Sequence, residues 1–329
     1  MDIRVIQYGL GPIGSAVARH VVERDGVKLV GGVDIDPAKI GQDVGSVIGL
    51  AEPLGFAVKK KLDEVLAETK ADVVLHTTAS YFDLFQSQVV EILKAGLDIV
   101  STAEEMSFPW LAHPQEAAAV DAAAKQAGKT VLATGVNPGF LMDSLPLNLT
   151  AICQRVDRID IKRVINASTR RGPFQAKIGA GMTVEAFQAK MDAGRMGHVG
   201  LPESIGMIFD TLGKNIVRYE SSVEPVVADR VIETDYVKVQ PGQVIGLKQV
   251  ARACTEEGEF ATLTFVAALD AAGEQDTITI TGRPTLKVTL QGTNGDLSTV
   301  AIAVNAIRRV REAAPGLVTM RDLPIVTHW

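Results

Sequence analysis

The sequence predicts an α/β protein that combines a Rossmann-type, doubly wound parallel sheet with a second, α+β domain built on an open, mostly antiparallel sheet. Three observations lead to this fold class. A glycine-rich turn over residues 9–14 directly follows an apolar strand, strands then alternate with helical stretches up to about residue 150, and beyond that point strands follow one another. The chain has 329 residues, of which 47% are hydrophobic, so it is long enough to bury two cores.

The turn between the first strand and the first helix has the pattern of a dinucleotide-binding loop. It consists of Gly9, Leu10, Gly11, Pro12, Ile13 and Gly14, with the strand Ile3 to Tyr8 before it and the helix-like segment Ser15 to Glu23 after it. The three glycines serve a tight turn, close approach of the backbone to a pyrophosphate, and close packing of helix on strand, in that order. The amides that open the helix can hold the pyrophosphate. An ordinary glycine turn is the alternative, but the order of strand, loop and helix favours a nucleotide site.

The second strand, Lys28 to Asp34, ends on an acidic residue that supports this interpretation. Asp34 lies 20 residues after Gly14, where a carboxylate accepts hydrogen bonds from the adenosine ribose. A strand-ending Asp is otherwise a common cap or turn residue. Because its charge repels a 2′-phosphate, we expect NAD or NADP as the cofactor, with NAD favoured. The cations Lys39 and Arg4 would weaken that preference.

The rest of the first half continues to alternate strands and helices. The expected strands are Asp72 to Thr77, Asp98 to Ser101 and Thr130 to Ala133, and the expected helices are Tyr81 to Lys94 and Pro114 to Gln126. Ligands of such sheets bind beyond the carboxyl ends of the strands. We therefore expect the strand exits to form the site, with Thr77 and Thr78 among the residues that bind the cofactor.

Two adjacent carboxylates follow the strand that ends at residue 101. Glu104 and Glu105 lie where a bound nicotinamide would face its substrate, in a segment that also holds Met106, Phe108 and Trp110. A carboxylate in apolar surroundings favours a cationic partner, because burying an unpaired charge is costly, and an amine or ammonium ion fits. The alternative is that the pair opens a helix and stabilises its positive dipole end.

The next exit holds the run Gly135 to Asp143, a tight turn that leads into a helix. Asn137 is expected to bond the nicotinamide carboxamide, and Gly139 to permit close approach of the ring. Plain turn chemistry accounts for Asn-Pro-Gly equally well, so both interpretations stay open.

Beyond about residue 150, strands separated by turn signals predict the open sheet. They are Arg158 to Ile165, Asn215 to Val223, Val231 to Val239, Thr262 to Leu269 and Thr277 to Thr281, with helices near Val184 to Ala193 and Glu203 to Leu212. A final helix over Ser298 to Ala313 has one apolar face and is expected to return to the first domain. We expect 1–145 with 296–329 to form the dinucleotide-binding domain, and 146–295 to form the substrate and dimerisation domain.

Histidines and arginines outside these turns are weaker candidates for metal binding, catalysis or substrate binding. His76, His113 and His198 lack metal-ligand spacing with Cys, Asp or Glu, so we expect no metal site. A lone His such as His198, in a loop before a helix, is more often structural than catalytic. The adjacent Arg170 and Arg171 either hold a substrate carboxylate or are a solvated pair.

Composition argues against several partners and compartments. A net charge of −6 without a basic stripe argues against nucleic acid. Cys153 and Cys254 are too few for a disulfide framework and indicate a reducing compartment. No apolar stretch is long enough to span a bilayer, and the start of the chain has no signal pattern. We expect a cytoplasmic protein without membrane association.

Several runs give the chain a resemblance to a known family. They are Gly9 to Gly14, Asp36 to Asp43 with Gly45 and Gly49, Ser101 to Pro109, Thr134 to Phe140, Gly197 to Leu201 with Glu203 and Ser204, and Ala314 to Pro324. On these motifs, the chain over nearly its whole length resembles the 2,4-diaminopentanoate dehydrogenases and native amine dehydrogenases, whose first domain is similar to that of dihydrodipicolinate reductase. The His-His and Lys signature of that reductase is absent.

The resemblance implies an NAD(P)-dependent amine dehydrogenase. Such an enzyme reversibly deaminates a primary amine or diamino acid, or aminates a ketone with ammonia, by hydride transfer. The resemblance assigns the contact with the amine to Glu104, with Glu105 as the fallback, and we expect a homodimer. The expected pocket walls are Phe140, Met142, Phe174 and His198. A C=N or C=O reductase of amino-acid metabolism and a catalytically inactive nucleotide-binding sensor are the alternatives.

Overall fold

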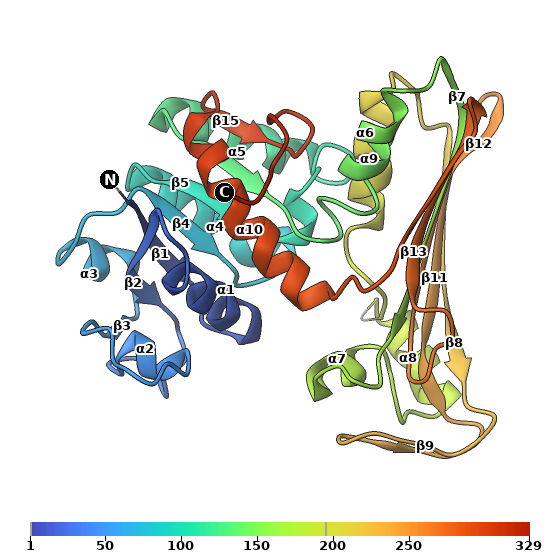
Figure 1. Ribbon diagram of the computed structural model, residues 1–329, viewed down its shortest axis with the longest axis horizontal. Coiled ribbons are helices and arrows are strands. Elements are labelled where there is room, and N and C mark those ends of the chain that lie inside the picture. Colours follow the sequence, from blue (N-terminus) through green and yellow to red (C-terminus); the bar gives the residue numbers. More distant parts are fainter. Residues whose placement is uncertain (1, 195) are drawn as a thin grey trace. The chain divides into compact units, whose positions relative to one another are not determined.

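The computed structural model describes residues 2–194 and 196–329. The chain divides into two compact units, one formed by Met1–Ser144 together with Asn294–Trp329 and the other by Leu145–Thr293. The C-terminal segment therefore returns to the first unit. Each unit has its own sheet (Figure 1).

The first unit is built on a seven-stranded sheet in the order β15-β6-β5-β4-β1-β2-β3, and its neighbouring strands run parallel. The strands are β1 (Ile3–Tyr8), β2 (Val27–Val33), β3 (Val58–Lys59), β4 (Val73–His76), β5 (Asp98–Ser101), β6 (Thr130–Ala133) and β15 (Gly316–Val318). The chain runs outward from β1 to β3 and then returns to β4 on the other side of β1. Ligands of doubly wound sheets bind at such a reversal, beyond the carboxyl ends of the strands.

Helices cover both faces of this sheet (Figure 1). On one face lie α1 (Pro12–Val22), α2 (Val44–Val47) and α10 (Gly295–Glu312), and on the other lie α3 (Leu62–Leu66), α4 (Phe82–Lys94) and α5 (Pro114–Ala127). Because neighbouring strand residues point to opposite faces, Val5 enters one core and Ile6 the other. Val304 and Ile307 of α10 belong to the first core, so the last helix packs against the sheet of this unit.

Local chemistry sets the ends of these helices. Pro12 occupies the first turn of α1, where its missing N–H costs no hydrogen bond. Gly128 ends α5 in the left-handed conformation, at φ 63°. The Asn294 side chain caps α10 by accepting hydrogen bonds from the amides of Asp296 and Leu297.

The second unit contains a six-stranded sheet in the order β14-β13-β7-β12-β11-β8. Its strands are β7 (Arg155–Asn166), β8 (Arg218–Val227), β11 (Val244–Thr255), β12 (Gly258–Ala268), β13 (Gln275–Arg283) and β14 (Leu286–Leu290). Strands β7 and β12 run parallel, whereas the other neighbouring pairs run antiparallel. The remaining elements of this part are α6 (Ser144–Thr150), α7 (Gly172–Lys177), α8 (Val184–Asp192), α9 (Leu201–Thr211), β9 (Ile232–Glu233) and β10 (Lys238–Val239).

One face of the second sheet carries an apolar core. Ile165, Leu247 and Phe265 from three strands pack there with Phe187 of α8. Arg163 shares this face, because it lies two residues before Ile165 on β7. A charged side chain is therefore built into an apolar layer.

The fold class is confirmed in both parts, but the elements differ in how well they were predicted. The strands Ile3 to Tyr8, Asp98 to Ser101 and Thr130 to Ala133 have the predicted bounds. The single strand expected over Val231 to Val239 is wrong, because that segment forms the short hairpin of β9 and β10. Strands β3, β11, β14 and β15 were not predicted.

Candidate functional site

The glycine turn after β1 has the geometry that its sequence predicts. Gly9 adopts φ 91°, and a Cβ on Gly14 would lie 1.9 Å from the Gly9 carbonyl oxygen. Both positions therefore require glycine on steric grounds. A Cβ on Gly11 would meet no atom within 4 Å. Space is open above the middle glycine, where a pyrophosphate would approach the backbone and the amides of Ile13 and Gly14.

Buried polar side chains hold this turn in place from below. Gln7 is fully buried, and its Nε2 donates to the Gly9 carbonyl at 2.9 Å and to Thr77 Oγ1 at 2.8 Å. The Thr77 hydroxyl in turn donates to the Gly9 carbonyl at 2.9 Å. A Cβ on Gly9 would lie 3.0 Å from Thr78 Cγ2, so Thr78 also lies against the turn. The structure thus brings Thr77 and Thr78 to the predicted loop.

Asp34 joins the turn to the loop that follows β2. Its carboxylate accepts hydrogen bonds from the Leu10 amide at 2.7 Å and the Asp36 amide at 2.9 Å, and Lys39 Nζ lies 3.2 Å away. Burial alone would raise the pKa of Asp34, but the amides of Asp36 and Leu10 and the Lys39 cation together lower it. The carboxylate is therefore ionised at neutral pH, at the place where a ribose hydroxyl would be bound.

Of the two cations expected to weaken the preference for NAD, only Lys39 lies beside Asp34. Arg4 is near the start of β1, and its guanidinium binds Asp72 through bonds of 2.9 and 3.0 Å. Asp34 follows the far end of the neighbouring strand β2. The expectation that Arg4 weakens the preference for NAD is wrong, because the length of the strand separates Arg4 from Asp34 at the carboxyl edge of the sheet.

The two adjacent glutamates are the first two residues of a single 3-10 turn, Glu104–Met106. Glu105 Oε2 accepts a hydrogen bond of 2.6 Å from the Phe82 amide at the start of α4, and it lies 3.3 Å from His113 Nε2. Glu105 therefore does serve a helix N-terminus, but that of α4. Burial first, and then the charges of Glu104 and Glu105, raise the pKa of Tyr81, which precedes α4.

The turn after β6 is held by a buried carboxylate. Asp143 is fully buried and accepts hydrogen bonds from the Gly139 amide at 2.7 Å and the Ser144 amide at 2.5 Å. Gly139 has φ 123°, and a Cβ there would lie 2.6 Å from the Gly135 amide nitrogen, so the turn itself demands glycine. Asn137 is nearly buried in the same turn. Its expected contact with a nicotinamide stays a prediction.

The expected pocket residues are divided between the two units. Phe140 and Met142 belong to the turn after β6, where Phe140 is 36% exposed and Met142 is fully buried. In the second unit, the His198 ring stacks on Phe265 with centroids 4.6 Å apart, and the His198 amide donates to Gln249. Phe174 lies under the Arg170 guanidinium at 4.5 Å. The assignment of these residues to one pocket stays a prediction.

The second sheet holds a buried ion pair that was not predicted from the sequence. Arg163 Nε lies 3.6 Å from Asp276 Oδ1, and both side chains are almost fully buried. Burial lowers the pKa of Arg163 and raises that of Asp276, so each group is pushed toward its neutral form. Within the described chain, Arg163 Nη1 and Asp276 Oδ1 have no hydrogen-bond partner. An Arg at the buried phase of a strand is the signal that could have found this pair.

Arg170 adds a second cation near Arg163, because its charge further lowers the Arg163 pKa. Arg170 is only 8% exposed, which rules out the solvated alternative for this member of the Arg170 and Arg171 pair. Buried guanidinium groups in proximity favour an anion such as a carboxylate.

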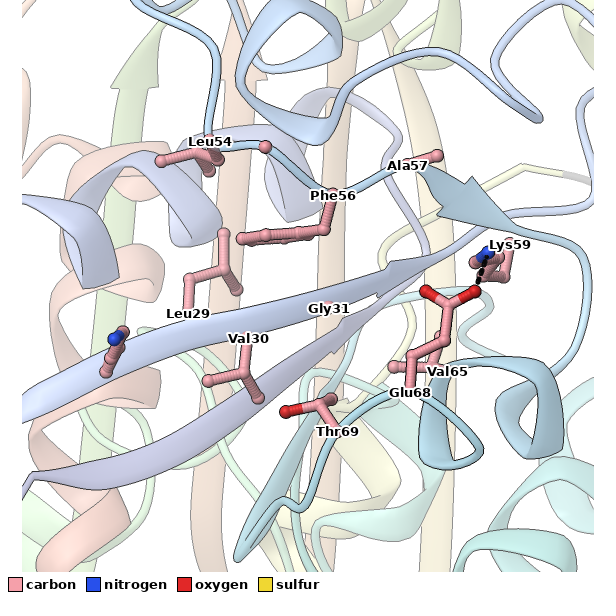
Figure 2. A pocket seen from close by; sticks show the side chains of 12 residues that line it. Leu29, Val30, Gly31, Leu54, Phe56, Ala57, Lys59, Val65, Glu68 and Thr69 are labelled. Carbon is pink, nitrogen blue, oxygen red and sulfur yellow. Dashed lines mark hydrogen bonds and ion pairs between the residues drawn. The ribbon is translucent and has the colours of Figure 1, made fainter.

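A separate cavity of about 410 Å³ lies along the outer part of β2 (Figure 2). Leu29 and Val30 of β2, Phe56 and Val65 border it, and an ion pair between Lys59 and Glu68 closes one end. It arises because β3 has only two residues and leaves much of the edge of β2 uncovered. None of the predicted site residues lines this cavity.

Over 2–194 and 196–329, no three His, Cys, Asp or Glu side chains form a group suited to a metal ion. In the same part of the chain, no helix combines the length and apolar character needed to cross a membrane.

Two protein families match this chain in sequence. Residues 140–329 match the family of the 2,4-diaminopentanoate dehydrogenase C-terminal domain, and residues 3–103 match the N-terminus of dihydrodipicolinate reductase. The first match covers more than half of the chain.

Similar proteins extend over almost the full length. The chain is 32% identical to a 2,4-diaminopentanoate dehydrogenase of Acetoanaerobium sticklandii, over 98% of this chain and 94% of that protein. It is 23% identical to an amine dehydrogenase of Streptomyces virginiae, over 98% and 96% of the two chains. The solved structure of an amine dehydrogenase from Mycobacterium smegmatis superposes with a TM-score of 0.89 at 28% identity, covering 100% of this chain and 98% of that one.

Proposed function

This chain belongs to the 2,4-diaminopentanoate dehydrogenase family, and we propose that it reversibly deaminates a primary amine in an NAD(P)-dependent reaction. In the reverse direction, a ketone and ammonia give the amine with loss of water and uptake of a hydride and a proton. When bound, a nicotinamide cofactor would supply that hydride to the carbon that bears nitrogen, or accept it in the deamination direction. The residues of this chain would bind the substrate, the ammonia and the cofactor, and would transfer the protons.

The assignment of different roles to the two adjacent glutamates supports this proposal. The family resemblance assigns the amine contact to Glu104, and Glu105 binds the Phe82 amide at the N-terminus of α4 and lies beside His113, so we propose Glu104 as the carboxylate that holds the amine. A carboxylate can hold ammonium, take the proton released when ammonia attacks the carbonyl, and return it to the departing hydroxyl. Its negative charge also stabilises the iminium cation that forms when water leaves.

The glycine turn fits the cofactor that this reaction needs. The open space above Gly11 suits a pyrophosphate, whereas the close contacts at Gly9 and Gly14 fix the turn beneath it. We propose that Gly11, Ile13 and Gly14 hold the pyrophosphate and that Asp34 binds the ribose. NAD is favoured over NADP because of the Asp34 charge, and Lys39 moderates the difference.

Within this activity, we propose a substrate that bears a carboxylate. The second unit holds Arg163 and Arg170 in buried positions, and Arg163 Nη1 has no acceptor among the described residues. Burial biases Asp276, the carboxylate 3.6 Å from Arg163, toward its neutral form. A bound carboxylate would supply the missing acceptor.

A coupled assay tests the activity. NADH and NADPH oxidation is followed with paired ketones that have or lack a carboxylate, each with and without excess ammonium. Oxidation that depends on ammonium supports the proposal, and a lower KM for the keto acids supports the carboxylate site. Oxidation without ammonium would instead favour a C=N or C=O reductase. Cofactor binding without turnover across the panel would favour the sensor alternative.

We also propose that the protein is a cytoplasmic homodimer that uses the second sheet as its interface. The face opposite the apolar core carries exposed charges in opposed pairs, with Arg252 across from Glu220 and Lys248 across from Glu224. Alternating charges of both signs suit contact with a second copy related by a two-fold axis. Light scattering over a range of protein concentrations, at low and at high salt, would test this. A monomer at every concentration would rule the dimer out.

A further inference from the structure

A hydrogen-bonded histidine lies beneath the strand exits of the first unit. His76 is the last residue of β4 and is fully buried between the rings of Tyr8 and Phe85, whose centroids lie 5.8 and 6.1 Å from its own. Burial lowers its pKa to about 4, so the ring is neutral at physiological pH. A neutral imidazole has one donor and one acceptor, so its partners must be matched to it.

The neighbours of His76 settle which nitrogen carries the proton. Nε2 lies 2.8 Å from Gln88 Oε1, a carbonyl oxygen that can only accept. Nε2 therefore bears the hydrogen, and Nδ1 accepts from the Ser101 hydroxyl at 2.9 Å. Thr78 Oγ1 lies 2.9 Å from Nε2 and donates to the same Gln88 oxygen at 2.6 Å. Both sides of the ring are thus occupied.

The Ser101 side of this network leads to the glutamate segment. Because the Ser101 hydroxyl donates its hydrogen to His76, its oxygen accepts the Ala103 amide at 3.0 Å. Ala103 directly precedes Glu104. The Thr102 amide also donates to the His76 carbonyl at 3.0 Å. The backbone that leads into Glu104 is therefore held by two successive amides, one on the His76 main chain and one through its ring.

We propose that His76 is a positioning residue for Glu104, acting through the Ser101 hydroxyl and the Ala103 amide. The inference rests on the proposed amine chemistry of Glu104. Linked hydrogen bonds strengthen one another in a buried setting, so the ring fixes the direction in which the segment leaves β5. A small displacement of a catalytic group lowers the rate steeply, which gives this network a role in turnover beyond its role in packing.

Two substitutions separate the two sides of the ring. The oxygen of an Asn side chain can take the place of Nδ1 and keep the bond to Ser101, whereas the amide of Gln can take the place of Nε2 and keep the bonds to Gln88 and Thr78. We expect His76→Asn to lie much closer to the wild type in kcat and in the KM for ammonium than His76→Gln does. We expect His76→Gln to raise that KM or lower kcat by about tenfold to 100-fold. The dissociation constant for NADH should stay unchanged in both.

Ser101→Ala removes one hydroxyl and should reproduce the His76→Gln defect without a change of ring. The double variant should be no worse than either single variant, because both break the same connection. Tyr8→Phe is the matched control: it keeps the ring that packs on His76 and removes only the hydroxyl that bonds Glu91, so it should change the melting temperature without changing the KM for ammonium.

The outcomes distinguish this inference from the proposed function. Wild-type protein without ammonium-dependent oxidation would defeat the proposed function itself. If the wild type is active and Ser101→Ala and His76→Gln lose only thermal stability, His76 is a packing residue and the inference is overturned. Equal kinetic losses in His76→Asn and His76→Gln would overturn it as well, because the Ser101 side would then have no special part.

Discussion

The carboxyl edge of the first sheet and the apolar face of the second sheet both contain buried polar side chains, but they are satisfied differently. At the first, Asp143 accepts main-chain amides of its own turn, and Asp34 accepts one amide two residues away and one from the glycine turn after the neighbouring strand β1. At the second, Arg163 and Asp276 meet across two strands at 3.6 Å, and each has an atom without a partner in the described chain. Main-chain donors complete a site before any ligand arrives, whereas the unsatisfied pair is costly by itself. We infer that the first region is built for fixed geometry and the second for an incoming polar group.

The largest expected effect lies at the first region. Glu104→Gln keeps the size of the side chain but removes its charge and basicity, so kcat should fall by about 10²- to 10⁴-fold while NADH affinity is retained. Steady-state kinetics together with NADH fluorescence titration would measure both. Glu105→Gln is the matched control. It should lower thermal stability through the weakened cap of α4 and leave most of the turnover. The reverse pattern would make Glu105 the catalytic carboxylate.

Substitutions in the second region should first of all lower the free energy of unfolding. Arg163→Leu leaves Asp276 buried without its cation, which costs about 3–5 kcal/mol, and Arg163→Leu with Asp276→Leu should recover much of that loss. Urea unfolding would measure the difference. If the pair also serves substrate, the double variant should regain stability yet keep a raised KM for keto acids. Recovery of both would reduce Arg163 and Asp276 to a structural ion pair.

Sequence reasoning located the first region because backbone sterics leave a local trace there. Gly9 and Gly14 cannot carry a side chain in this turn, and Asp34 ends a strand at a fixed distance from them. The second region has no such trace, since Arg163 and Asp276 are 113 positions apart in the sequence and meet only through the register of β7 and β13. For the same reason the hairpin at β9 and β10 was misread as one strand. An apolar run does not show where its pairing partner lies.

Acid should weaken the first region through His76. The folded pKa of about 4 lies below the ordinary value of 6.5, so as the pH falls through 6.5 the unfolded chain takes up a proton that the folded protein refuses. Stability is therefore present above pH 6.5 and is lost toward pH 4, by about 2 kcal/mol between pH 7.5 and 5. Urea unfolding at these two pH values would show it. His76→Gln should flatten the dependence, whereas His113→Gln should retain it. An equal slope in His76→Gln and wild type would mean that the histidine is not held neutral.

The smallest expected effect concerns the cofactor. Lys39 lies 3.2 Å from Asp34 and is partly exposed, so its charge offsets the carboxylate only in part. Lys39→Met should therefore increase the preference for NADH over NADPH by up to about fivefold, and Asp34→Ser should move it the other way. Ratios of kcat/KM for the two cofactors would measure the change. Arg4→Met is the control, because Arg4 binds Asp72 near the opposite end of the sheet and should leave the ratio unaltered. An effect of Arg4 as large as that of Lys39 would show that net charge, and not the contact at Asp34, sets the preference.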